Sequence, residues 1–261
     1  MTTVNPYAAP KAAVADETVV ANADFVPGGQ SRPAGNGWTW IAEGWELFKR
    51  QPGLWIGMTL LVFIMFFAMG LLPFVGGLIS TLLWPVILVG IAIGCRTLDQ
   101  GEEMELGHLF AGFRDNVGTL LGIGALVLAA TFAVILFVFA VMGVSMFGMM
   151  GSGDPEAVMQ MGISMVLAGL ISLALLLPVM MAAWFAPLLV AFHGFGAWEA
   201  IRMSFRGCLR NVLPFLIYGV ALLVLGILAL IPIGLGLLIV WPVGMASIYT
   251  SYKDIYLKPR P

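Results

Sequence analysis

The fold is decided by residues 54–95, LWIGMTLLVFIMFFAMGLLPFVGGLISTLLWPVILVGIAIGC, which contain no Asp, Glu, Lys or Arg. Three further stretches are equally free of charge: 118–153, 157–192 and 212–252. A helix needs about 20 apolar residues to cross roughly 30 Å of hydrocarbon. Divided at Pro73, at residues 151–156 and at Pro232, the uncharged stretches are long enough for six transmembrane helices.

The composition excludes an ordinary soluble domain. The chain is 61% hydrophobic and 10% charged, whereas soluble domains are about 25% charged. It also lacks the basic, aromatic-rich surface that nucleic-acid binding requires. We therefore expect an all-α, six-helix transmembrane bundle. Its approximate spans are 54–72, 75–95, 118–142, 163–192, 213–231 and 234–252.

The basic residues between these spans all fall at joins that face the same side of the membrane. They are Lys49, Arg50, Arg96, Arg114, Arg202, Arg206, Arg210 and Lys253. The opposite joins carry only Asp154 and Glu156. Because Lys and Arg concentrate on the cytoplasmic side, we expect a multi-pass protein of a bacterial inner membrane with both termini in the cytoplasm.

The first 37 residues differ from the rest of the chain. Residues 1–37 are rich in Ala, Pro, Gly and small polar residues and have no periodic apolar pattern. Such a composition buries too little apolar surface to order itself. We expect a disordered cytoplasmic leader at 1–37 and a transmembrane domain at 38–261.

An internal repeat connects the two ends of the transmembrane domain. Phe48 precedes Pro85 by 37 residues, and Phe205 precedes Pro242 by the same 37. A third copy between them starts at Phe113 and carries an insertion. Each copy holds two spans, so all copies enter the membrane from the same face. The pattern predicts three parallel two-helix repeats related by an axis along the membrane normal.

Each repeat begins with a short amphipathic segment. The apolar residues at helical spacing are Trp38, Ile41, Trp45 and Phe48 in the first repeat, Leu106, Leu109, Phe110 and Phe113 in the second, and Trp198, Ile201, Phe205, Leu209 and Val212 in the third. Helices with an aromatic apolar face and a charged face lie in the membrane interface. We expect three cytoplasmic interfacial helices; the alternative is that these segments continue into the spans.

Two sets of residues are candidates for binding. Arg202, Arg206 and Arg210 recur every four residues and therefore form one stripe on a helix. This stripe could hold the phosphate headgroups of anionic lipids, or it could serve only to set topology. The second set could line a central cavity, because mid-span prolines kink helices and free backbone carbonyls. Its members are Trp84, Pro85, Trp184, Pro187, Trp241 and Pro242.

The motifs of the commonest membrane enzymes and pumps are missing from the sequence. No ionisable residue lies deep in a predicted span, where proton relays and ion pathways need one. Walker, zinc and nucleophile-elbow motifs are also missing. We expect no catalytic residue, no metal and no cofactor. The leading hypothesis is a non-enzymatic protein that organises membrane lipids, a membrane protein partner or further copies of itself. The alternative is a carrier or channel for an apolar or lipid-like solute.

Several sequence blocks resemble a family of uncharacterised six-span bacterial inner-membrane proteins. The blocks are NPYAAP at 5–10, GWTW at 37–40, GWELFK at 44–49 and LGHLFAGF at 106–113. More distantly, the arrangement is similar to the membrane domains found beside glycerophosphodiester phosphodiesterases. The resemblance implies a six-span membrane fold and no particular ligand. No activity carries over, because the chain has no such catalytic domain.

Overall fold

The computed structural model describes residues 25–152 and 155–258, and this part of the chain is built from helices. In order they are α2 (Asn36–Arg50), α3 (Pro52–Gly70), α4 (Val75–Asp99), the 3-10 helix η1 (Leu106–Phe113), α5 (Val117–Ser152), α6 (Pro155–Trp184), α7 (Ala186–His193), α8 (Ala197–Arg210), α9 (Val212–Leu230) and α10 (Leu237–Tyr256). The predicted all-α fold is confirmed.

Five helical segments of the described chain are long and apolar enough to cross a membrane. They are Pro52–Gly70, Val75–Asp99, Val117–Gly143, Met161–His193 and Val212–Leu230. They coincide with the first five predicted spans. The sixth predicted span, 234–252, falls on α10, whose second half carries Ser247, Thr250 and Ser251. These polar residues make α10 less apolar than the other five.

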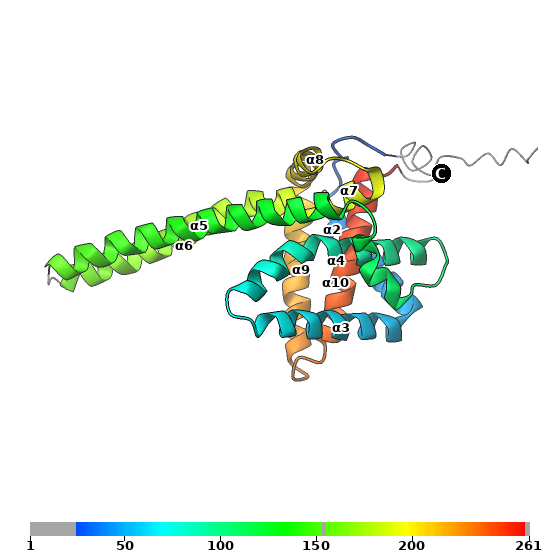
Figure 1. Cartoon of the computed structure of the whole chain (residues 1–261), viewed down its shortest axis with the longest axis horizontal. Helices are drawn as coiled ribbons and strands as arrows, with labels where there is room; N and C mark the ends of the chain where they lie inside the picture. The colour runs from blue at the N-terminus through cyan, green and yellow to red at the C-terminus, as the bar shows by residue number, and fades with distance from the viewer. Residues whose placement is uncertain (1–24, 153–154, 259–261) are drawn as a thin grey trace, which may run out of the picture.

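The long helices pair into hairpins that extend in different directions from a common region. We call this region, where α2, η1 and α8 pack on α10, α4 and α6, the base. In Figure 1 α5 and α6 run side by side away from the other helices, while α3–α4 and α9–α10 form two shorter hairpins. The tips of the shorter hairpins are alike. Phe74 and Ile233 both have positive φ, 62° and 55°, and are 93% and 96% exposed. Bulky residues rarely adopt this conformation, so both tips are strained turns.

At the base, each short amphipathic element packs on the second helix of a hairpin. Helix α2 packs on α10, η1 on α4, and α8 on α6. Glycines permit two of these contacts. A Cβ atom on Gly44 would lie 2.7 Å from the carbonyl oxygen of Val243, and one on Gly112 would lie 2.1 Å from that of Val86. Both carbonyls belong to the residue after a mid-helix proline.

The third contact is polar and lies at a break in the helix. Helix α6 ends at Trp184, and α7 begins at Ala186. The backbone N–H of Phe185 donates to Ser204 Oγ over 2.9 Å, and Ser204 Oγ donates to the carbonyl of Met181 over 2.7 Å. The helix is therefore interrupted just before Pro187, whereas Pro85 and Pro242 lie inside the continuous helices α4 and α10.

The predicted apolar faces of the amphipathic elements only partly match the buried ones. In α8 the buried residues are Ala200, Met203, Ser204, Gly207 and Cys208, whereas Trp198 of the predicted face is 67% exposed. In α2 Trp40 and Gly44 are buried and Trp38 is exposed. Small residues pack inward because they let backbones approach closely. Of the large aromatic side chains, Trp38, Trp45 and Trp198 remain on the outer surface, whereas Trp40 and Phe48 of α2 are buried.

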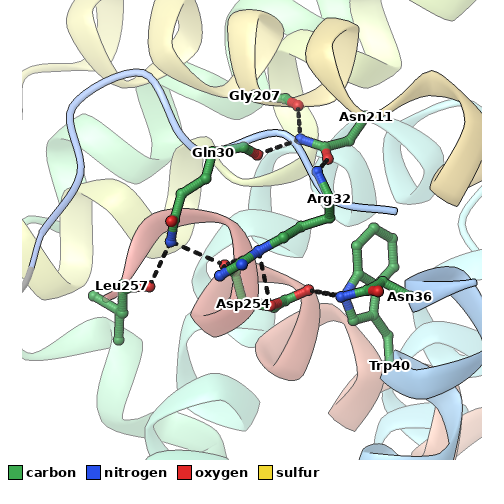
Figure 2. A network of polar contacts seen from close by, with 8 residues as sticks. All are labelled: Gln30, Arg32, Asn36, Trp40, Gly207, Asn211, Asp254 and Leu257. Atoms are coloured by element: carbon green, nitrogen blue, oxygen red, sulfur yellow. Dashed lines mark hydrogen bonds and ion pairs between the residues drawn. The ribbon is translucent and has the colours of Figure 1, made fainter. Parts of the chain in front are cut away.

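Residues 25–35 pack against the base, although the sequence predicts disorder throughout 1–37; residues 1–24 lie outside the described residues. Figure 2 shows Asp254 of α10 at the centre of the contact. Its carboxylate accepts from Arg32 Nε at 2.9 Å, from Asn36 Nδ2 at 2.8 Å and from Trp40 Nε1 at 2.9 Å. We call this group the Asp254 clasp. The disorder expectation fails here because composition does not reveal a partner at the far end of the chain.

Asn211, at the join of α8 and α9, holds the same segment from the other side. The Asn211 side chain donates to the carbonyls of Gln30 and Gly207, at 2.9 and 2.8 Å, and accepts from the N–H of Arg32 at 2.8 Å. The residue is fully buried. Every polar atom of the amide thus has a partner, as burial requires. The N-terminal segment therefore joins α8, α9 and α10 at one end of the molecule.

Candidate functional site

A cavity of about 480 Å³ lies among α4, α5 and α6, and is partly open. Its walls are formed mainly by apolar side chains: Leu88 from α4, Ile123 and Val127 from α5, and Leu176, Val179 and Ala183 from α6. Phe66 of α3 and Ile248 of α10 also line it. The size falls in the range of about 300–1,000 Å³ that is typical of sites for small molecules.

Four of the six residues predicted to line a cavity do so. They are Trp84, Pro85, Trp184 and Pro187. Trp241 and Pro242 lie elsewhere. Trp241 packs edge-on against Phe63, with ring centroids 5.4 Å apart, and Pro242 is buried in α10. Helix α2 packs closely on α10 beside Pro242, where a Cβ atom on Gly44 would lie 2.7 Å from the carbonyl oxygen of Val243.

The two tryptophans of the cavity are held by aromatic neighbours on other helices. Trp84 packs edge-on against Phe66 of α3, with centroids 5.9 Å apart. Trp184 packs edge-on against Phe215 and Tyr218 of α9, at 5.8 and 6.1 Å. The indole nitrogen of Trp184 is buried and has no hydrogen-bond partner in the described part of the chain. A buried N–H without a partner costs free energy, so this wall has unused donor capacity.

Hydroxyl groups supply the rest of the polarity in the cavity walls. Ser80 and Thr81 of α4 and Thr131 of α5 line the space. Thr81 Oγ1 donates to the carbonyl of Gly77 at 2.9 Å, and Thr131 Oγ1 donates to that of Val127 at 2.8 Å. No lining residue carries a charge. Such walls suit a neutral, largely apolar molecule.

These hydroxyl residues were not among those predicted from the sequence to line a cavity. A signal for one of them was present, since Thr81 stands four positions before Pro85 and its carbonyl is the one that the proline leaves without a helical donor. Thr131 has no comparable signal, because its place in the wall depends on how α5 packs against α4.

The predicted basic stripe is divided between two environments. Arg202 and Arg206 are exposed on α8. They lie on the same side as Trp198 and as Leu209, which is 56% exposed. Arg210 instead donates to the carbonyls of Gly28 and Gly29, at 3.1 and 2.8 Å. The first two arginines therefore share a surface with apolar side chains, while the third holds the N-terminal segment.

Neither cysteine has the surroundings of a reactive thiol. Cys95 and Cys208 are both free and buried. Burial raises the pKa of the Cys208 thiol to about 12, although a hydrogen bond with Ser204 acts in the opposite direction. The Cys208 thiol is therefore protonated at neutral pH and a poor nucleophile. Among the described residues, no three His, Cys, Asp or Glu side chains form a group that could hold a metal ion.

Comparison with known proteins gives the family. No family model matches the chain, and no solved structure matches it. A probable inner membrane protein of Burkholderia thailandensis is 31% identical over 197 residues, which cover 71% of this chain and 72% of that protein. The chain belongs to the family of this inner membrane protein. The family assignment agrees with the five helical segments that are apolar enough to cross a membrane. The protein is therefore an inner membrane protein.

Proposed function

We propose that this inner membrane protein is a non-enzymatic carrier that holds an apolar or lipid-like molecule in the cavity among α4, α5 and α6. The observation that carries the proposal is the cavity itself, about 480 Å³ in volume and lined mainly by apolar side chains, where the first half of α5 and the end of α6 pack on α4. The absence of charged residues among those that line it argues against acid–base or nucleophilic chemistry there.

We also propose that the chain crosses the membrane six times and has both termini in the cytoplasm. Helix α10 would be the sixth span, packed through its polar second half on α2. The cyclic packing of α2, η1 and α8 on α10, α4 and α6 supports three parallel repeats. A reporter that is active only outside the cytoplasm should be active when inserted near Asp154, which lies outside the described residues, and inactive at Gly101. The opposite result would reject this topology.

A second function is favoured by the outer surface of the base. Aromatic side chains are exposed on all three amphipathic elements: Trp38 and Trp45 on α2, Phe110 and Phe113 on η1, and Trp198 on α8. Aromatic residues concentrate where membrane meets water. In this alternative the base organises anionic lipids, a partner membrane protein or further copies of the chain. The distant likeness to membrane domains beside glycerophosphodiester phosphodiesterases is compatible with either function.

The carrier proposal is tested by purification in native lipid discs and identification of everything that is bound. The variant Ala183→Phe would fill the cavity, because Ala183 lines it. Ala174→Phe is the matched control, since Ala174 lies on the same helix and is exposed. We expect a stoichiometric apolar molecule with the wild type and with Ala174→Phe, and its loss with Ala183→Phe. Equal retention by both variants would reject the cavity as the site.

A further inference from the structure

The polar groups of the cavity restrict the chemistry of the molecule it would hold. Each threonine hydroxyl has a single hydrogen and two lone pairs. Thr81 and Thr131 already donate that hydrogen to backbone carbonyls one turn earlier. Towards a bound molecule these hydroxyls can therefore act only as acceptors unless the helical contacts are broken.

The two prolines add backbone acceptors to the same walls. Proline has no N–H, so the carbonyl four residues earlier loses its helical donor. That carbonyl belongs to Thr81 for Pro85 and to Ala183 for Pro187. All four residues line the cavity. Acceptors are thus concentrated in the turn of α4 that precedes Pro85 and at the end of α6.

One donor lies in the same turn of α6. The indole N–H of Trp184 is next to Ala183 in sequence and is buried without a partner among the described residues. The cavity wall therefore has several acceptors, and a buried donor without a partner among the described residues lies beside them in otherwise apolar surroundings. A hydroxyl group complements such a site, because it both donates and accepts hydrogen bonds.

We infer that the cavity selects a neutral long-chain molecule that carries a hydroxyl group, held at the level of Thr81, Ala183 and Trp184. The hydroxyl hydrogen is donated to the oxygens of α4, α5 or α6, and the alkyl chain occupies the apolar remainder. A molecule that only accepts hydrogen bonds, such as an ether or an ester, leaves the wall acceptors unmatched. This inference rests on the proposed function, since it names the class of molecule for the same cavity.

The test uses the full-length protein in lipid discs and three radiolabelled probes of equal chain length: 1-hexadecanol, pentadecyl methyl ether and heptadecane. Retention per protein is measured against discs that lack the protein. We expect the alcohol to be retained about tenfold more tightly than the ether, because a single hydrogen bond is worth up to roughly this factor. Heptadecane should bind most weakly.

Two variants test whether the hydroxyl groups of the cavity wall determine this preference. Thr81→Val combined with Thr131→Val should reduce the preference for the alcohol over the ether several-fold. Thr97→Val is the matched control, because Thr97 makes the same bond to the carbonyl four residues earlier, at 3.1 Å, but does not line the cavity. Equal retention of alcohol and ether by the wild type would overturn the inference and leave the carrier proposal standing. Retention of none of the probes would reject both.

Discussion

Helix α4 and the α5–α6 hairpin are both strongly apolar, yet they are packed very differently. In the most apolar part of α4, 56% of the residues are buried inside the protein, whereas the corresponding value is 6% in both α5 and α6. Figure 1 shows the same contrast, with α4 among other helices and α5–α6 extending away from them. Apolar character therefore predicts insertion into a membrane, and does not predict which helices form the protein core.

The glycines of the two regions explain the difference. A Cβ atom on Gly90 of α4 would lie 2.2 Å from the carbonyl of Leu109, and one on Gly94 would lie 2.5 Å from the sulfur of Met104. On α5, Gly118 and Gly122 have no atom within 4 Å of the same position. Lipid is as apolar as a helix surface, so helices in membranes associate through close packing of small residues. Gly124 of α5, which does pack on α4, would place its Cβ atom 2.8 Å from the carbonyl oxygen of Leu82, whereas Gly143 of α5 and Gly162 and Gly169 of α6 again have no atom within 4 Å.

The largest effect should come from adding one methyl group at the base. Gly112→Ala would place a Cβ atom 2.1 Å from the carbonyl oxygen of Val86. Because η1 must then move off α4, we expect a loss of about 3 kcal/mol in the free energy of unfolding. Thermal or denaturant unfolding in detergent micelles measures it.

The matched control is Gly118→Ala, where the methyl group enters open space. We expect a change within about 0.5 kcal/mol, as for other substitutions that touch no packed group. Similar losses for the two variants would show that close packing does not distinguish the base from the α5–α6 hairpin.

The Asp254 clasp should give the second-largest effect. Asp254→Ala removes the acceptor of Arg32, Asn36 and Trp40, and we expect a loss of about 2 kcal/mol because two neutral donors and one cation lose their partner. Asp99→Ala removes the bridge to Lys253, whose two side chains are about a third exposed, and a long hydrogen bond of 3.4 Å from the Tyr249 hydroxyl. Such exposed pairs contribute less than about 1 kcal/mol. If Asp99→Ala proves the more harmful, the N-terminal segment does not stabilise the base.

These contrasts also indicate what the sequence could predict. The uncharged stretches, each long enough to cross a bilayer, predicted the positions of the long helices, because transfer into lipid depends on composition. The prolines and tryptophans located four residues of the cavity. The Asp254 clasp could not be predicted, since it joins residues more than 200 positions apart through an apparently featureless leader. Trp241 was predicted to lie near the cavity but packs on Phe63 of α3, a contact that the repeat in sequence does not reveal.

A smaller effect is expected on the exposed surface of α8. Replacing Arg202 and Arg206 together by Gln should lower co-purified anionic phospholipid several-fold, since each basic residue near an anionic membrane contributes about 1 kcal/mol. Arg210→Gln should leave lipid retention almost unchanged and reduce stability, because Arg210 donates to the carbonyls of Gly28 and Gly29. Equal loss of lipid from both variants would show that all three arginines bind lipid as a single stripe.

The most direct test of the carrier proposal is photolabelling with a long-chain alcohol that carries a diazirine on its chain, followed by mapping of the labelled peptides. If the cavity is the site, labels should concentrate on cavity residues such as Leu88, Val127 and Val179, and excess unlabelled 1-hexadecanol should remove them. Labels spread over exposed residues of the hairpin, such as Phe139 and Leu173, and unaffected by the competitor would contradict the proposal.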